Sequence, residues 1–144
     1  MVELKELLCS KQHKQAHDFC LQLEQQSEES ADLYSSLPLF LEMLDSDNAF
    51  VCVRGFRLVC AQAKWDAEGQ IKQHLQKILN ALDDEKPTNV RQCLSGLPKL
   101  MQYKPHLKDA IRDKLATLDL SKYKDSMRPL IMGDIDDVMR LIEE

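Results

Sequence analysis

Glycine and proline are scarce in this chain, which has 4 glycines and 5 prolines among 144 residues. Sandwiches and barrels need many tight turns, and turns are built largely from these two residue types. Leu, Ala, Gln, Lys, Glu and Asp each outnumber Val and Ile, a composition that favours helices. The sequence therefore predicts an all-α chain, and its length is that of a single domain.

An excess of basic residues is also absent. The chain has 19 Lys and Arg against 24 Asp and Glu, a formal net charge of −5 at pH 7. This total removes the expectation of nucleic-acid binding that a basic domain carries, although a local basic patch can outweigh it. A nucleic-acid partner is disfavoured by the composition but stays open.

Long apolar runs are missing as well. The first residues, MVELKELLCSKQHK, contain acidic side chains and no apolar run of the length found in signal peptides. No stretch of the sequence approaches the roughly 20 apolar residues of a membrane-spanning helix. We expect a cytoplasmic protein with no membrane partner.

Cysteines are few, odd in number and scattered, with no CxxC pair: Cys9, Cys20, Cys52, Cys60 and Cys93. In a reducing compartment such cysteines are typical small core residues. A reactive or regulatory thiol remains the alternative.

Catalytic motifs are absent from the sequence. There is no P-loop, no GxGxxG and no GxSxG, and neither His74 nor His106 has a Ser, Cys or acidic partner at a recognisable motif spacing. The sequence therefore predicts a non-enzymatic protein without a cofactor.

The sharpest candidate for metal binding is the series Cys9, His13, His17 and Cys20. On one helix, His13 and His17 would share a side, as in a His-x3-His metal grip. Cys9 and Cys20 would then lie about 16 Å apart, too far for a single tetrahedral ion. We therefore predict no metal site here.

Apolar residues recur at helical spacing almost from end to end, after a short opening turn around Leu4. Asp66 is a candidate N-cap, and Asp134 after Gly133 marks the start of a last helix. The predicted helices cover residues 11–26, 31–44, 49–64, 67–82, 89–103, 105–118, 122–132 and 134–143.

An internal repeat is the strongest signal. Arg54, Arg91 and Arg128 lie 37 residues apart, and each follows an apolar residue. Upstream of each pair a helix ends in Leu and is followed by a turn, DSDN, DDEK or DLSK. One unit is therefore an apolar helix, a largely acidic turn, and a helix that opens with an apolar residue and Arg.

The segment LPLFLEMLDSDNAFVCVRGFRLVCAQA resembles a HEAT repeat, the unit of HEAT/armadillo-like α-solenoids, and three copies in phase cover about residues 33–131. The resemblance implies a short α-α superhelix of three to four hairpins within one domain, 1–144. Residues 1–30 would form an N-terminal capping segment and 134–144 a C-terminal capping helix. The segments RGFRLVCAQAKWD and DDEKPTNVRQCLSGLPKL also resemble the sequences of small stand-alone bacterial HEAT proteins of unestablished function, which are sometimes labelled SufBD.

In the HEAT pattern the repeated arginine reaches an acid in an inter-helix turn. The resemblance thus implies that Arg54, Arg91 and Arg128 form a structural ladder with Asp47, Asp84 and Glu85. Arg54 and Arg91 should then be substantially buried, bonded to turn acids or carbonyls, and Arg91→Ala should destabilise the fold. Contact of these arginines with nucleic-acid phosphates is the alternative.

The function expected from these features is a protein-interaction scaffold or adaptor that presents a curved helical surface to a partner protein or peptide. Taking the helices at 67–82 and 105–118 as the second helices of their hairpins, we expect them to line the concave side and to bind the partner through Gln73, Lys77, Asn80, Asp109, Arg112 and Asp113. A nucleic-acid-binding module related to DNA-repair HEAT proteins is the alternative. A role as an iron–sulfur assembly accessory is a third, implied by the SufBD label alone.

Overall fold

The computed structural model describes residues 2–144, and within that range the chain is all-α, without a strand, as the composition predicts. No helix of this range is long and apolar enough to cross a membrane. Short 3-10 turns precede or extend several helices. The helices are α1 (Val2–Leu8), α2 (His13–Glu29), α3 (Leu37–Met43), α4 (Ala49–Ala61), α5 (Gln70–Gln73), α6 (Leu75–Asn80), α7 (Pro87–Tyr103), α8 (Lys108–Ala116) and α9 (Arg128–Glu143).

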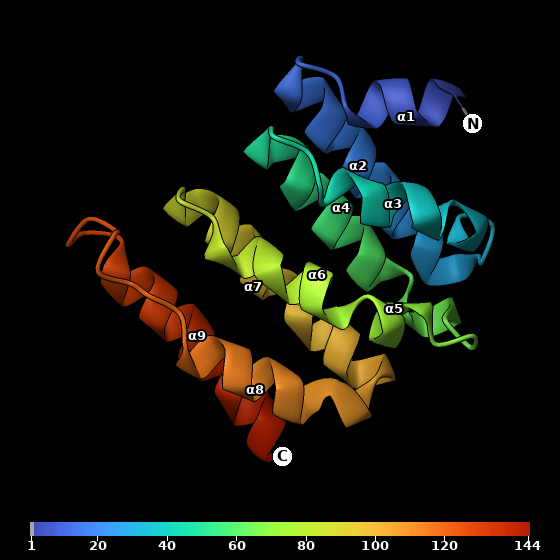
Figure 1. Ribbon diagram of the computed structural model, residues 1–144. Helices are drawn as coiled ribbons and strands as arrows, with labels where there is room; N and C mark the ends of the chain where they lie inside the picture. Colours follow the sequence, from blue (N-terminus) through green and yellow to red (C-terminus); the bar gives the residue numbers. More distant parts are fainter. Residues whose placement is uncertain (1) are drawn as a thin grey trace.

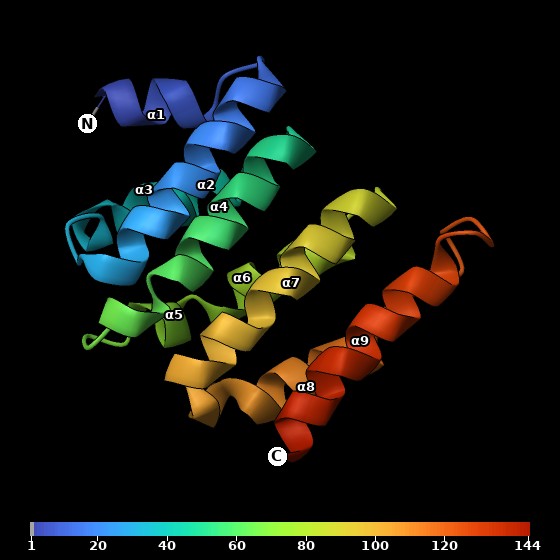
Figure 2. The same cartoon turned by 180° about the vertical axis from the view of Figure 1, so that it is seen from behind.

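The helices form two layers, which Figures 1 and 2 show from opposite sides. The front layer of Figure 1 holds α1, α3, α5, α6 and α8, and the back layer holds α2, α4, α7 and α9. Successive hairpins join one helix of each layer, and along the back layer α4 packs against both α2 and α7, and α7 packs against α9. The N-terminus and the C-terminal helix lie at opposite ends of the array.

The core is continuous, and α4 lies at its centre. The sequence places Val51 and Leu58 opposite the main apolar stripe of this helix, which predicts burial on two sides. Both are buried, with 5% and 0% of their surface exposed, and Phe56 on the main stripe is fully buried as well. The helix is therefore an interior element, enclosed by its hairpin partner and by both neighbours in the back layer.

Side-chain caps set the start of two helices. The Oδ1 of Asn48 accepts hydrogen bonds from the amides of Phe50 (2.9 Å) and Val51 (3.4 Å) at the start of α4. Asp66 accepts from the amides of Gln70 and Ile71, both at 3.0 Å. It satisfies the first amides of α5 as predicted, but the N-cap position itself is Gly69, three residues later.

The predicted helix over 67–82 is interrupted. The structure has α5 and α6 instead, and the backbone leaves helical angles at His74 (φ −112°, ψ 18°). The ring Nδ1 of His74 lies 2.9 Å from the carbonyl oxygen of Gln70, which also accepts the His74 amide. A side chain that competes for a helix carbonyl in this way favours a break.

The prediction of two C-terminal helices over 122–132 and 134–143 is wrong. A single helix, α9, begins at Arg128, so Gly133 and Asp134 are interior and the capping helix starts earlier than 134. The segment before α9 is held against the α6–α7 turn: the Tyr123 hydroxyl donates to the carbonyl of Asp84 (2.5 Å), and Lys122 donates to that of Asp83 (2.9 Å). These long-range bonds replace helical ones.

Candidate protein-interaction surface

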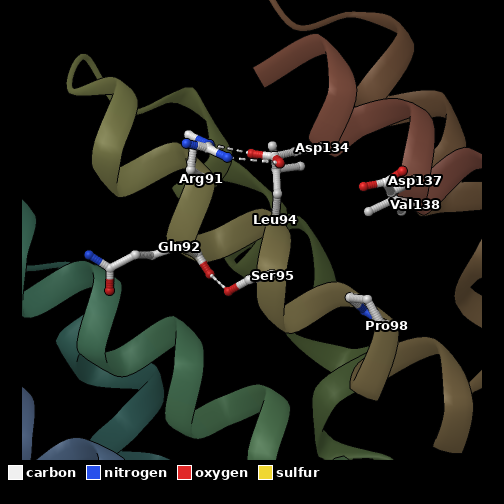
Figure 3. Close-up of a pocket in the computed structure, with 8 residues that line it drawn as sticks. All are labelled: Arg91, Gln92, Leu94, Ser95, Pro98, Asp134, Asp137 and Val138. Carbon is white, nitrogen blue, oxygen red and sulfur yellow. Dashed lines mark hydrogen bonds and ion pairs between the residues drawn. The ribbon is translucent and has the colours of Figure 1, made fainter. Parts of the chain in front are cut away.

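A groove runs along the back layer between α7 and α9, and we call it the α7–α9 groove. One end is a cavity of about 400 Å³ (Figure 3), lined by Arg91, Gln92, Leu94, Ser95, Pro98, Asp134, Asp137 and Val138. The other end is a cavity of about 670 Å³, lined by Ser95, Pro98, Lys99, Met101, Gln102, Pro105, Lys108, Leu141 and Glu144. Ser95 and Pro98 line both, so the two cavities join.

The floor of the groove is apolar and its edge holds exposed leucine. Leu94, Met101 and Val138 are buried at its base, whereas Leu141 is 37% exposed. Leu130, 45% exposed, precedes Leu141 by three helical turns and so shares its face of α9, about 16 Å away. Large exposed apolar side chains in a row beside a groove are typical of a surface that contacts another molecule.

The two ends of the groove differ in charge. At one end Arg91 binds Asp134 through two hydrogen bonds of 2.7 and 3.3 Å, an arrangement that raises the pKa of Arg91. Asp137 adds a further negative charge there, and its partner Arg140 is highly exposed. At the other end Lys99 and Lys108 face the single acid Glu144. Among the lining residues, acids outnumber cations at one end, the acidic end, and lysines outnumber the acid at the other, the basic end. Asp137 and Lys99 also pair with residues outside this lining, Arg140 and Glu28.

Pro98 adds an unusual feature to the floor. It lies inside α7, which continues to Tyr103, and it has no amide hydrogen to donate to the carbonyl of Leu94 one turn earlier. Leu94 lines the acidic end of the groove. The Leu94 carbonyl therefore lacks the amide donor that the residue one turn later supplies in a regular helix.

Most cations elsewhere on the back layer are already neutralised. Arg57 on α4 donates to Glu24 on α2 at 2.9 and 3.1 Å. Burial alone would lower the pKa of Arg57, but the bonds to Glu24 raise it above its usual value. Lys99 pairs with Glu28. Arg57 and Lys99 are therefore not free to bind a phosphate backbone.

The three repeated arginines have three different environments. Arg54 is 2% exposed and donates to the carbonyls of Leu8 (2.7 Å) and Ser10 (3.3 Å), so its burial and its bonding to carbonyls are confirmed. Arg91 is not substantially buried, since 40% of its side chain is exposed, and it pairs with α9 rather than with a turn. Arg128 bonds within its own loop, to the carbonyl of Tyr123 (3.1 Å) and to Asp125.

The three turn acids of the predicted ladder have other roles. Asp47 is exposed. Asp84 accepts from the amide of Lys86 (2.8 Å) and from the side chain of Asn89 (3.3 Å), and Glu85 lies 3.7 Å from Lys122. The ladder is therefore not formed as predicted, because the repeated arginines bond to the end of α1, to α9 and to their own loop.

The six residues expected to bind a partner lie in the front layer. In the structure α5, α6 and α8 are the first helices of their hairpins, so the assignment of 67–82 and 105–118 as second helices is wrong. That Gln73, Lys77, Asn80, Asp109, Arg112 and Asp113 bind a partner stays a prediction. Lys77 already pairs with Asp45 (2.6 Å). Arg112 pairs with Asp109 (3.2 Å) and Asp113 (3.7 Å), two other residues of this set.

The cysteines are all free thiols. Burial raises the pKa of Cys20 and of Cys60 to about 12 and raises that of Cys93 further. From residue 2 onward, no three or more His, Cys, Asp or Glu side chains lie close enough together to hold a metal ion. Instead, His13 contacts Arg54 and Cys20 contacts Glu24.

The groove was not anticipated from the sequence, although part of its signal is visible there. Leu130, Asp134, Asp137 and Leu141 follow the 3–4 residue spacing of one helical face. The sequence prediction placed a break at Gly133 and so assigned these four residues to two separate helices. Their common face was therefore not recognised. Comparison with family models, curated proteins and solved structures finds no match to this chain.

Proposed function

We propose that this chain is a non-catalytic protein-interaction module that holds a helical segment of a partner protein in the α7–α9 groove. The groove carries the proposal: it combines an apolar floor, exposed leucines on its edge and ends of opposite charge. Helical segments bind such grooves through apolar side chains at i, i+3 or i+4, and i+7 positions.

The charge of the groove defines the partner segment more closely. The end at Asp134 and Asp137 suits a Lys or Arg side chain, whose stem can lie on Pro98 and whose head can donate to the Leu94 carbonyl. The end at Lys99 and Lys108 suits an acidic side chain. The partner is therefore an amphipathic helix with basic and acidic ends and apolar residues between them.

The test begins with a photo-crosslinking amino acid placed at Gln102, on the groove, or at Gln73, on the front layer; both positions are exposed. Crosslinking in the native cell identifies the partner and its segment, and the isolated segment is then titrated against the purified protein. We expect crosslinks from position 102 and not from position 73.

Two matched variants separate the faces of α9. Leu141→Asp should weaken the segment by about tenfold or more, since a buried leucine contributes roughly 1.5–3 kcal/mol. Met132 is also exposed but lies on the opposite side of α9 from Leu141. Met132→Asp should therefore leave the affinity for the segment within about twofold.

The competing assignments give different results. Loss of binding in the double variant Lys77→Glu, Arg112→Glu, with Leu141→Asp unaffected, would place the partner on the front layer instead. Tight binding of duplex DNA at physiological salt would favour the nucleic-acid alternative.

A further inference from the structure

A further, smaller cavity of about 250 Å³ lies among α2, α4 and α7, and we call it the His13 recess. Its lining comes from three back-layer helices: His13, Lys14 and His17 of α2, Phe50, Val53 and Arg54 of α4, and Gln92 of α7. Within the described part of the chain, none of the residues that line it is Asp or Glu. A recess lined by Arg54, Lys14 and two histidines, and by no acid, is unexpected in a chain of net charge −5.

Arg54 gives the recess a buried positive charge that no carboxylate balances. Its side chain donates only to the carbonyls of Leu8 and Ser10 and to the ring of His13, and over residues 2–144 it has no ion pair with an acid. A buried charge is costly without a counterion, and carbonyl dipoles compensate it only in part.

His13 offers a hydrogen-bond donor on its second ring nitrogen. All nitrogens of a guanidinium carry hydrogens, so the His13 Nδ1 that lies 3.4 Å from Arg54 Nη1 acts as the acceptor. The ring proton of His13 is then on Nε2. The Phe50 ring, with its centroid 4.5 Å from that of His13, holds the imidazole in place.

The remaining surroundings add positive potential. The recess lies at the N-terminal ends of α2 and α4. Asn48 already accepts from the first amides of α4, but no side chain of residues 2–144 caps those of α2. Lys14 is exposed, and His17 lies one turn further along. The Oε1 of Gln92 is buried without a partner, and Figure 3 shows this side chain directed away from Asp134, toward α4. A 180° rotation of the Gln92 side-chain amide would exchange Oε1 for Nε2 and so supply a further donor.

From these observations we propose that the His13 recess binds a phosphate monoester group. Arg54, His13, Lys14 and His17 line the cavity from two helices, and together they carry more donors than the two oxygens of a carboxylate require. A phosphate carries three acceptor oxygens and a charge of about −1.5 to −2, which matches Arg54 and Lys14. The proposal is independent of the partner groove, which is lined by other residues apart from Gln92.

Nuclear magnetic resonance of the ¹⁵N-labelled protein tests this proposal. Inorganic phosphate, blocked phosphoserine and acetate are titrated separately at constant ionic strength. We expect saturable shifts of the His13, Lys14 and Gln15 amides with both phosphates, and weaker, non-saturating shifts with acetate. Tighter binding of blocked phosphoserine than of inorganic phosphate would assign the group to a modified protein side chain, whereas equal binding would assign it to a free phosphate compound.

A pair of charge reversals provides the control. Lys14→Glu should weaken phosphate binding by about tenfold, the equivalent of roughly 1.4 kcal/mol. Lys11→Glu makes the same change just outside the recess, at another exposed lysine, and should alter affinity by less than about twofold. Equal weakening by the two variants, or shifts that never saturate, would overturn the proposal.

Discussion

Gly55 on α4 lies so close to Phe40 on α3 that a Cβ at Gly55 would come within 2.8 Å of the Phe40 carbonyl oxygen. The same Cβ would lie 2.8 Å from the Cβ of Met43. Both neighbouring atoms belong to, or adjoin, the main chain of α3 and have little freedom to move. The hairpin of α3 and α4 therefore depends on glycine at this position.

Gly55→Ala should lower the free energy of unfolding by about 1–3 kcal/mol, because the added methyl group overpacks the α3–α4 contact. Urea denaturation measures the change. Gly133→Ala is the matched control: nothing lies within 4 Å of a Cβ there, and the residue is inside α9. It should raise stability by roughly 0.5–1 kcal/mol. A stable Gly55→Ala protein would show that α3 can move away.

Arg54 and Arg91 should respond differently to replacement by alanine. Arg54→Ala leaves the buried carbonyl of Leu8 and the half-buried carbonyl of Ser10 without their donor, so we expect a loss of about 1–3 kcal/mol. Arg91→Ala breaks an ion pair that is open to solvent and should leave the melting temperature close to that of the wild type. This replaces the sequence-based expectation that Arg91→Ala destabilises the fold. Equal melting temperatures for both variants would contradict the distinction.

Asp66 should make stability depend on pH in the acid range. Burial would raise the pKa of this carboxyl group, but the Tyr34 hydroxyl (2.6 Å) and the amides of Ile71 and Gln70 outweigh it and hold the pKa below its ordinary value. The stabilisation is therefore complete above the unfolded pKa of about 4 and is lost as the pH falls through the lower, folded pKa.

Asp66→Asn should lower stability at pH 7 by roughly 1–3 kcal/mol, because one side-chain oxygen becomes a donor that faces other donors. Its urea midpoint should also fall less than that of the wild type between pH 7 and pH 3. Asp32→Asn, at an exposed position, should retain the wild-type pH profile. An Asp66→Asn profile parallel to the wild type would contradict the assignment.

The five thiols should differ in reactivity toward an aromatic disulfide reagent at neutral pH. Cys20, Cys60 and Cys93 are buried with raised pKa values, so they should react only after unfolding in urea. Cys9 and Cys52 are half-buried and should react in the native protein. Cys52 should be the slower of the two, since burial and the nearby Asp84 and Asp45 raise its pKa. Rapid reaction of all five thiols in the folded protein would contradict the core packing.

The Arg repeat shows how far periodicity predicts contacts. The equal spacing places Arg54 and Arg91 in the second turn of α4 and α7, whereas Arg128 is the first residue of α9. Their partners differ: Arg54 and Arg91 bond to distant segments, the end of α1 and α9, whereas Arg128 bonds to the loop directly before α9. A local sequence pattern contains no information on which distant carbonyl or carboxylate will lie within reach.

The sequence by itself determined the all-α class, the order of the helices and the buried faces of α4, because helical periodicity and capping act over a few neighbouring residues. Tertiary structure decided the features that depend on distant segments. It continued α9 through Gly133, where burial of Ile131 and Val138 outweighs the roughly 1 kcal/mol cost of an interior glycine. It also placed α9 against α7 to form the groove and brought Arg54 beside His13, since each of these contacts joins residues about 40 apart in the chain.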